Sequence, residues 1–326
     1  MRPRAPLAKQ RGVAMLIAVL IVALGTILAA GIAFSSAMSA RRGRATLAMD
    51  ESVLVAQAAE ALAAYALRED LKAGRQVDHP AEEWGQPLGP VEVVPGITLE
   101  AYLEDLGGRF NLNSLVVTDP ATGQVGVDQN ALADLKDLFE RLGLETKWAS
   151  YIADWIDPDS LPLPDGAEDS AYAGQNPPYR TPNMYISSVS ELLALPEFGR
   201  DRYLRILPYV TALPPNATIN VCSASGLLLD TLVGPNYQQF SILDPKQFAK
   251  NRESQCFPSK QAYSASFGSD MNRWTQNVEG RVEQTSQYFR LTSIVTIGTA
   301  DFALYSLLQR EQSGQVKVLM RSFTPD

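Results

Sequence analysis

The sequence predicts an α+β fold, and three patterns along the chain support this assignment. A helical pattern without any proline runs from Val13 to about Leu71. A mainly helical pattern covers residues 128–209, and strand-like alternation occupies about the last 45 residues. A long helix that covers an antiparallel sheet, together with a helical insertion, accounts for all three patterns in one domain arrangement.

The N-terminal segment is long enough to cross a membrane. An apolar run of 22 residues extends from Val13 to Phe34, which corresponds to about 33 Å of helix. An ordinary signal peptide has a shorter apolar region of about 7–15 residues, so the sequence favours a retained anchor over residues 13–34. The basic leader places the N-terminus on the cytoplasmic side, although three arginines beyond the run oppose this. The leader carries Arg2, Arg4, Lys9 and Arg11, and the opposing residues are Arg41, Arg42 and Arg44.

Beyond the membrane-spanning part, the pattern predicts that the helix continues as an amphipathic helix to Leu71. Apolar residues recur at spacings of 7, 4, 4 and 3, which indicates one helical face. These residues are Leu47, Leu54, Ala58, Leu62 and Tyr65, whereas Asp50, Glu51 and Glu60 are expected on the side facing water.

The rest of the chain gives further elements in order. Alternation predicts a strand over 97–105, and helical patterns cover 131–142, 147–156, 190–195, 200–207 and 226–233. We expect Asp128 to cap the helix over 131–142 and Gly143 to end it, with Ser187 or Ser188 capping the helix over 190–195. Three strands over 284–297, 300–310 and 315–323, separated by Gly298 and Ser313-Gly314, predict an antiparallel meander.

Composition excludes some classes of function. With 28 basic and 36 acidic residues the net charge is -8, which argues against a general nucleic-acid binder. The single histidine, His79, precedes a proline in a polar stretch, so we expect a solvated loop residue. Multi-histidine metal sites and histidine-dependent nucleophile triads are thereby excluded unless His79 itself takes the role. The two cysteines, Cys222 and Cys256, predict free buried thiols in a reducing compartment or one disulfide in an oxidising compartment.

The first residues resemble a known processing signal. The basic leader, Gln10-Arg11-Gly12 and the apolar helix are similar to the type III signal of type IV pilins and pseudopilins. This resemblance implies that a prepilin peptidase cuts after Gly12 and leaves Val13 as the first residue, usually methylated. The chain departs from the pattern at Val13, which is usually Phe, and at Ile17, which is usually Glu. A carboxylate inside the bilayer is costly unless it pairs with a neighbouring subunit. The absence of Glu therefore fits a subunit at the tip of a filament, which has no further neighbour to recruit. The alternative is that Gly12 is incidental and the segment is a plain anchor.

Further segments extend the resemblance over nearly the whole chain. Together with the N-terminus, they resemble the minor pseudopilin K (GspK) family of type II secretion systems. The segments are Gly108-Arg109-Phe110-Asn111-Leu112-Asn113, Asp154-Trp155-Ile156-Asp157-Pro158-Asp159, Gly166-Ala167-Glu168-Asp169 and Ser190 with Leu193. The chain departs from the family at Val221-Cys222-Ser223, where Asn-Val-Asn-Thr-Ala is more common.

The resemblance implies a division of the chain and a function. It implies a cleaved leader over 1–12, a helix over 13–71, a pseudopilin domain built from 72–108 and 265–326, and a helical insertion over 109–264. The implied protein is not an enzyme. It initiates or caps the pseudopilus at its tip, with the minor pseudopilins I and J as partners and no nucleic acid. It is held in the inner membrane by a single span, and its C-terminal domain lies in the periplasm.

An acidic loop is the candidate metal site. Six carboxylates fall within 16 residues, and such crowding is repulsive unless water or a cation compensates it. Calcium takes six to eight oxygen ligands in flexible geometry, although the loop lacks EF-hand spacing. A solvated loop and a calcium site both remain open from the residues, and the family resemblance implies calcium. The candidate ligands are Asp157, Asp159, Asp165, Glu168 and Asp169, while Asp154 is the residue that could instead face inward from its helix.

Other functions remain as alternatives. The chain could be a membrane-anchored periplasmic calcium-binding module or enzyme unrelated to a filament. Two of the loop carboxylates could perform glycosidase chemistry, but nothing in the sequence selects a pair. The Asn-Leu-Asn and Ile-Asn-Val segments could be helix-hairpin-helix DNA contacts, against which the acidic balance and the membrane helix both count.

Overall fold

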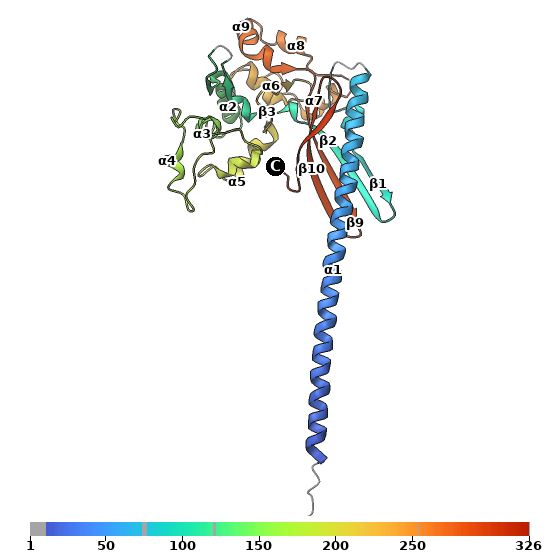
Figure 1. Cartoon of the computed structure of the whole chain (residues 1–326). Coiled ribbons are helices and arrows are strands. Elements are labelled where there is room, and N and C mark those ends of the chain that lie inside the picture. The colour runs from blue at the N-terminus through green and yellow to red at the C-terminus, as the bar shows by residue number, and fades with distance from the viewer. Residues whose placement is uncertain (1–10, 74–76, 120–121, 254, 326) are drawn as a thin grey trace, which may run out of the picture. The chain divides into compact units, whose positions relative to one another are not determined.

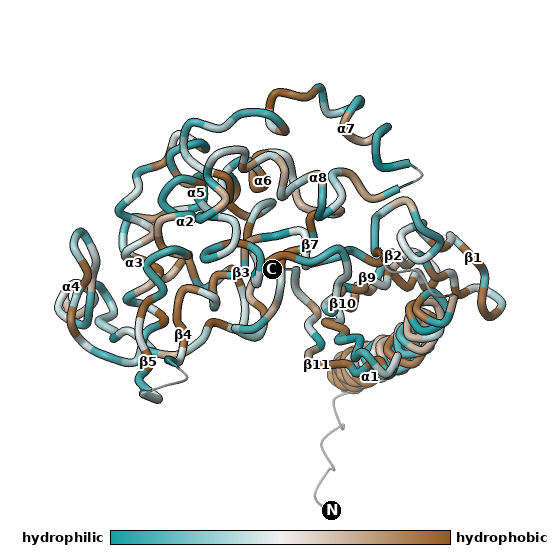
Figure 2. The backbone as a smooth tube through the Cα atoms, turned by 90° about the horizontal axis from the view of Figure 1, so that it is seen from above, coloured by the Kyte–Doolittle hydropathy of each residue, from teal (hydrophilic) through white to brown (hydrophobic). Residues whose placement is uncertain are grey.

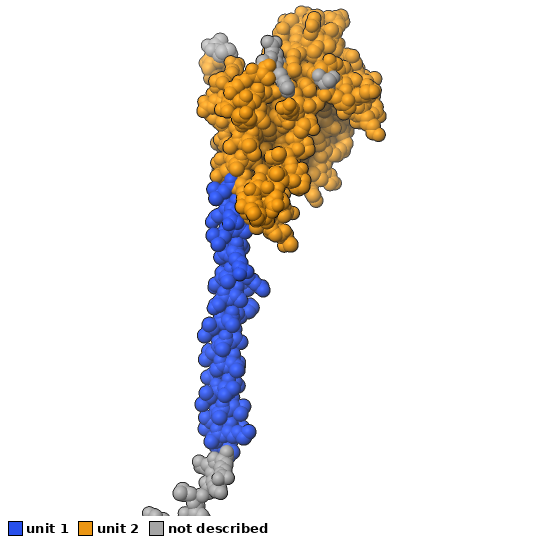
Figure 3. Space-filling model, turned by 90° about the vertical axis from the view of Figure 1, so that its right-hand side faces the viewer, with its two compact units in different colours: residues 1–54 blue, residues 55–326 orange. Residues whose placement is uncertain are grey.

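A computed structural model of the chain describes residues 11–73, 77–119, 122–253 and 255–325. It divides into two compact units, residues 1–54 and residues 55–326, which are coloured separately in Figure 3. The leader residues 1–10, on which part of the processing prediction depends, lie outside the described residues.

The first unit is the N-terminal part of one helix, α1 (Arg11–Lys72), drawn in blue in Figure 1. Its 62 residues confirm the helix predicted over 13–71. No charged residue lies between Arg11 and Arg41. Among the described helices, α1 is the one that is long and apolar enough to cross a membrane.

The second unit contains a five-stranded antiparallel sheet in the order β1-β2-β9-β10-β11. The predicted strand over 97–105 and the predicted C-terminal meander are both confirmed. Gly298, which has a φ of 65°, forms the turn between β9 and β10. The strands are β1 (Leu88–Val94), β2 (Ile97–Asp105), β9 (Tyr288–Ile297), β10 (Ala300–Arg310) and β11 (Val316–Ser322).

The C-terminal part of α1 packs against this sheet through small residues, and not through the stripe that the spacing predicted. The predicted face is wrong, because Leu62 and Tyr65 are 55% and 57% exposed. The buried face carries three alanines, whose small side chains allow the helix to approach the strands closely. This core consists of Ala56, Ala59, Ala63 and Leu67 with Trp84, Ile97, Leu99, Ala101, Phe289, Leu291, Val295, Leu304 and Leu308.

Glu60 is also placed differently from the prediction that it faces water. It is buried, and its Oε1 accepts a hydrogen bond from Ser306 Oγ at 2.6 Å. Arg321 donates from Nε and Nη2 to the two Glu60 oxygens, each at 2.8 Å. This two-point pair replaces the water that a buried carboxylate has lost.

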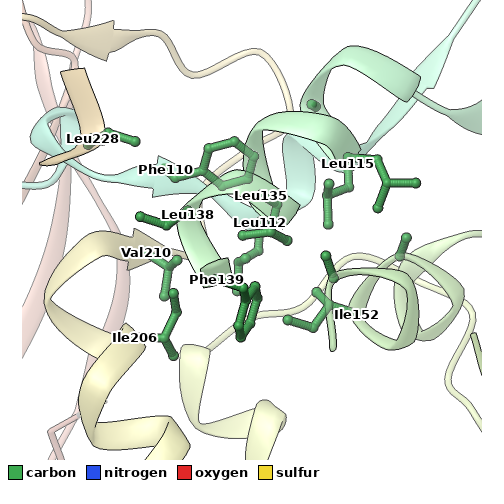
Figure 4. Packing of buried hydrophobic residues seen from close by; sticks show 14 of the residues in the cluster. Phe110, Leu112, Leu115, Leu135, Leu138, Phe139, Ile152, Ile206, Val210 and Leu228 are labelled. Atoms are coloured by element: carbon green, nitrogen blue, oxygen red, sulfur yellow. The ribbon is translucent and has the colours of Figure 1, made fainter. Parts of the chain in front are cut away.

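The remaining helices pack around a second hydrophobic core, whose buried residues lie between Phe110 and Val282 in the sequence. In Figure 2, α2, α3, α5 and α6 lie together on one side of the second unit. Figure 4 shows part of their core, including Phe110, Leu135, Phe139 and Ile152. The helices are α2 (Gln129–Arg141), α3 (Lys147–Ile156), α4 (Asp169–Tyr172), α5 (Gly199–Ile206), α6 (Gly226–Val233), α7 (Pro245–Asn251), α8 (Lys260–Ala265) and α9 (Met271–Arg273).

Several of these helices begin and end at the positions that the sequence predicts. Asp128 accepts hydrogen bonds from the backbone of Asn130 and Ala131, and Gly143 follows α2 with a φ of 62°. The segment predicted as a helix over 190–195 is a 3₁₀ helix, η4, capped by Ser188 in a capping box. Segment η4 spans Val189–Ala194, and the other 3₁₀ helices are η1 (Glu83–Gly85), η2 (Leu106–Gly108), η3 (Leu112–Leu115), η5 (Leu207–Tyr209) and η7 (Glu279–Arg281), whereas η6 (Trp274–Val278) is a π-helix.

Two short parallel ladders connect distant parts of the chain. Strand β3 (Phe110–Asn111) pairs with β6 (Val210–Thr211), and β7 (Ile219–Asn220) pairs with β8 (Val282–Glu283). An antiparallel pair joins β4 (Val116–Thr118) to β5 (Val125–Val127). The helical core also includes Phe267, Trp274, Val278 and Val282. This packing favours an end of the insertion after residue 282, later than the predicted boundary at 265.

Candidate functional site

The acidic loop begins where α3 ends, and it brings three carboxylates together. Asp157 is the C-cap of α3 and turns the chain out of the helix with an extended backbone. Carboxylate oxygens of Asp157, Asp159 and Glu168 all lie within 4.8 Å of one another. Asp157 and Glu168 are only 2% and 5% exposed, whereas Asp159 is exposed. We call these three residues the carboxylate cluster.

The carboxylate cluster has no cationic side chain to compensate its charge within the described part of the chain. Burial, and then the nearby charges of Asp159 and Glu168, raise the pKa of Asp157 to about 7. Burial likewise raises the pKa of Glu168, although Thr181 Oγ1 donates a hydrogen bond to Glu168 Oε2 at 3.2 Å. Three ionised carboxylates at this separation repel one another, so the cluster holds a proton more tightly than isolated acids do.

Two oxygen atoms of the cluster have no hydrogen-bond donor. Asp157 Oδ1 and Glu168 Oε1 are buried, and no donor reaches either atom among the described residues. Buried polar atoms are normally paired, so unpaired oxygens in one cluster are candidates for ligands of a cation. Calcium prefers carboxylate oxygens and tolerates irregular loops, so the donor set fits this metal.

Asp154 has a different role from the cluster. It is fully buried, and its Oδ1 accepts a hydrogen bond from the backbone N–H of Leu163 at 3.1 Å. Burial raises the pKa of Asp154 to about 6. A Cβ at Gly166 would lie 2.0 Å from Asp154 Oδ2, so the loop folds over this carboxylate only because residue 166 is glycine. Asp154 therefore faces inward and holds the loop against α3.

The structure does not bring the other two predicted ligands into the cluster. Asp165 is exposed at a turn with a φ of 63°. Asp169 instead accepts hydrogen bonds from Thr181, from the backbone N–H at 3.1 Å and from Oγ1 at 3.0 Å, and lies 3.7 Å from Arg180 Nε. Thr181 is a supporting residue that the sequence analysis missed. No local pattern indicates it, because its contacts join positions 12 and 13 residues apart in an irregular loop.

The predicted processing residues lie at the start of α1. Val13 and Ile17 are helical and 56% and 54% exposed, and Gly12 is also helical. Residues 1–10 of the predicted leader lie outside the described residues.

The disulfide prediction is confirmed. Cys222 and Cys256 are bonded, and Cys222 is fully buried in the helical core. The bond closes a loop with a sequence separation of 34 residues. Between the two alternatives left open by the sequence, the structure selects the one expected in an oxidising compartment.

Two other sequence predictions are corrected. His79 is not solvated, because it is only 8% exposed and its Nε2 lies 3.9 Å from Glu82 Oε1. The asparagines proposed as DNA contacts, Asn111, Asn113 and Asn220, are at most 3% exposed. Their side chains hydrogen-bond inside the protein, so they do not reach a nucleic acid.

Three comparisons relate the chain to known proteins. Residues 108–215 match the family described as type II secretion system (T2SS), protein K. The chain is 33% identical to the type II secretion system protein K of Pseudomonas aeruginosa, over 96% of this chain and 92% of that protein. It is 29% identical to the protein of the same name from Pectobacterium carotovorum, over 97% of each chain.

A solved structure has a similar fold. It is the crystal structure of the GspK-GspI-GspJ complex from the type 2 secretion system of enterotoxigenic Escherichia coli. The matched chain is 22% identical with a TM-score of 0.72, over 86% of this chain and 98% of that chain. The α+β fold predicted from the sequence is therefore confirmed.

Proposed function

The chain belongs to the type II secretion system protein K family, and from this premise we propose that it acts as the minor pseudopilin at the pseudopilus tip. There it would initiate or cap the filament that serves protein export across the outer membrane. The observation that carries this proposal is similarity over 92% of the Pseudomonas aeruginosa relative, so that the apolar helix and the insertion are both included. Family membership disfavours an anchored calcium-binding module unrelated to a filament. We propose a structural role and not an enzymatic one.

The N-terminal processing forms part of this proposal. We propose that prepilin peptidase cuts after Gly12, that Val13 becomes the first residue, and that its new amine is methylated. Ile17 then lies at the fifth mature position, where no carboxylate is available to pair with a neighbouring subunit. A tip subunit has no neighbour above it to recruit, so an apolar residue there avoids the cost of a charge in the bilayer.

The proposed location is the inner membrane, with one span and a periplasmic C-terminal domain. The uncharged stretch between Arg11 and Arg41 supports the span. The disulfide between Cys222 and Cys256 supports an oxidising compartment for the domain.

Minor pseudopilins I and J are the proposed partners, following the complex that the solved structure contains. The C-terminal part of α1 supports this, because Leu62 and Tyr65 remain exposed on the face that does not pack on the sheet. Apolar side chains on an open helix face suit packing against helices of other subunits.

Mass spectrometry of the N-terminus tests the processing. The full chain is produced with and without prepilin peptidase, and we expect the mass of a chain that begins at Val13 only with the peptidase. Gly12→Val is the control, because the bulky residue should block the cut. An uncut wild-type chain in the presence of active peptidase would reject the pseudopilin assignment.

Co-purification in detergent tests the partners. The full chain is expressed with its minor pseudopilins I and J, and Leu62→Asp with Tyr65→Asp is expected to reduce recovery of the complex. Leu161→Asp is the matched control, because Leu161 is 77% exposed and belongs to the acidic loop, not to α1. Equal recovery from both variants would contradict this use of the helix face.

We propose further that the carboxylate cluster holds calcium. Asp157, Asp159 and Glu168 would supply the ligands, and the cation would neutralise their charge and fasten the loop to the end of α3. The unpaired oxygens of Asp157 and Glu168 support this assignment. A melting curve of the full chain with calcium should lie above the curve with a chelator, because a ligand that binds only the native state stabilises it. Identical curves would reject the calcium site.

A further inference from the structure

An apolar hollow lies beside α7, away from the carboxylate cluster. It has a volume of about 640 Å³, within the usual range for ligand pockets. Its walls come from the start of α6, the segment that leads into α7, and α7 itself. Figure 2 shows α7 at the periphery of the second unit, and the chain leading into it is coloured as hydrophobic. The apolar lining residues that matter below are Leu227, Phe240, Leu243, Phe248 and Ala249.

The hollow also contains a cation that forms no ion pair within the described part of the chain. Arg252 Nε donates to the carbonyl oxygen of Phe257 at 2.7 Å, and Nη2 donates to the carbonyl oxygens of Val221 and Ala224 at 3.0 and 2.7 Å. Its guanidinium lies 4.3 Å from the ring centre of Phe248. Burial lowers the pKa of Arg252 to about 10, so its charge is kept at neutral pH.

One part of the guanidinium remains available. Among the described residues none accepts a hydrogen bond from Arg252 Nη1, although Nε and Nη2 are fully used. The neighbouring Glu253 is exposed and lines the hollow, but it forms no ion pair with Arg252 within the described residues. Asp105 is the carboxylate whose charge acts on Arg252, and it does so without contact and more weakly than burial. A partly desolvated guanidinium with two free N–H groups is a strong donor to a carboxylate.

A second hollow adjoins the first. The second hollow, of about 680 Å³, shares Pro80 and Ser225 with the first. Its lining contains Arg109 but also the carboxylates of Glu104 and Asp105, so it offers no excess of positive charge. The first hollow, where Arg252 lies among apolar side chains, is therefore the one suited to a carboxylate.

We propose that the first hollow binds a peptide segment of another protein, in which a carboxylate lies next to apolar side chains. The carboxylate accepts hydrogen bonds from Arg252 Nη1, and the apolar side chains pack between Leu243 and Phe248. Charge complementarity selects this occupant, because a cation without an ion pair in an apolar hollow favours an acidic and apolar partner over a basic one. The site does not depend on whether the chain caps a pseudopilus.

Two matched peptides test the proposal on the full chain in detergent. The probes are acetyl-Leu-Phe-Asp-Leu-amide and its twin with Asn in place of Asp, titrated by ligand-observed NMR. We expect the Asp peptide to bind at least about 10-fold more tightly, since charged hydrogen bonds are about twice as strong as neutral ones. Arg252→Gln should abolish this preference. A third probe with benzoylphenylalanine in place of Phe should cross-link to residues that line the first hollow.

Arg252→Gln loses three hydrogen bonds to carbonyl groups, so its folding has to be separated from its effect on binding. A second variant therefore tests the hollow with Arg252 in place. Ala249→Trp fills the hollow from an exposed helical position, and it should weaken binding at least about 10-fold while melting like the wild type. Lys250→Gln, next to it on α7, should bind normally. Equal affinity for the two peptides, unchanged binding by Ala249→Trp, cross-links elsewhere, or no binding up to about 1 mM would each overturn the proposal.

Discussion

Replacing Asp157 with asparagine is expected to stabilise the metal-free chain, although it removes a proposed calcium ligand. Asp157 is buried beside Asp159 and Glu168, with no compensating cation among the described residues. Its ionised form is therefore costly in the folded state, and its pKa rises from 3.8 to about 7. The asparagine side chain has nearly the same shape and cannot ionise, so this cost disappears in Asp157→Asn.

The magnitude follows from the change in pKa. One pH unit of difference corresponds to about 1.4 kcal/mol, so the rise sets an upper limit of about 4 kcal/mol. Exposure of Asp159 screens part of the repulsion, and we expect a gain of about 2 kcal/mol, or about 4–8 °C in melting temperature. Between pH 4 and pH 7 the folded chain holds a proton that the unfolded chain has lost. Stability of the metal-free wild type should therefore fall as the pH rises through 7, and the advantage of Asp157→Asn should shrink towards pH 4.

Tryptophan fluorescence during heating of the full chain in detergent provides the assay. Wild type and Asp157→Asn are compared at pH 8 and pH 5, each with a chelator and with excess calcium. The variant should melt higher than the wild type in chelator at pH 8, and calcium should raise the melting temperature of the wild type but not that of Asp157→Asn.

Asp165→Asn is the matched control, because it makes the same chemical change at an exposed position of the same loop. Asparagine also tolerates the positive φ of Asp165, so the backbone is not strained. We expect this variant to behave like the wild type in all four conditions. A lower melting temperature for Asp157→Asn in chelator at pH 8, or a normal calcium response from it, would refute the reasoning.

Three further changes are expected to lower the stability of the folded chain. Reduction of the Cys222–Cys256 bond should lower the free energy of unfolding by about 3–4 kcal/mol in a denaturant titration, because the bond closes a loop with a separation of 34 residues. Arg310→Met should cost about 3–5 kcal/mol by the same measurement, because it removes the buried cation that pairs with the carboxylates of Asp70 and Asp78. Gly166→Ala should lower the melting temperature and weaken the calcium response, because the new Cβ would lie 2.0 Å from Asp154 Oδ2.

Each change has a control in the same chain. Reductant should not alter a variant with both Cys222→Ala and Cys256→Ala. Arg180→Met should cost less than about 1 kcal/mol, because Arg180 pairs with Asp169 on the surface. Gly174→Ala should be neutral, because no heavy atom lies within 4 Å of a Cβ at that position. A control that loses as much stability as its partner variant would contradict the corresponding explanation.

Much of the fold was predictable because the spacing of apolar residues along the sequence matches the residues that are buried in the structure. The helix over 147–156 and the strands over 97–105 and 300–310 have the predicted bounds, since their periodicity continues to residues that cap or turn the chain. The buried face of α1 was not predictable from apolar spacing. Alanine contributes little to a hydrophobic stripe, yet its small size is what lets α1 lie close to the sheet.

The candidate site was only partly predictable, for a reason of geometry. The sequence shows that Asp154, Asp157, Asp159, Asp165, Glu168 and Asp169 are crowded. Which oxygens converge depends on irregular turns, and these are set by contacts such as that between Gly166 and Asp154. No periodic pattern governs such a loop, so composition can indicate a cation site without indicating its ligands.

Asn111 and Asn220 lie in two similar segments, Phe110-Asn111-Leu112 and Ile219-Asn220-Val221, and their hydrogen bonds connect distant parts of the chain. Each asparagine uses its Oδ1 to accept a hydrogen bond from the backbone two residues later, which fixes its own turn. Each also donates from Nδ2 to a distant segment, Asn111 to Pro214 at 2.8 Å and Asn220 to Asp105 at 2.9 Å. An amide side chain carries both an acceptor oxygen and donor N–H groups, so it can accept locally and donate across the fold at the same time. The two asparagines therefore have equivalent structural roles, one on each parallel ladder. This role accounts for the residues that were considered as DNA contacts.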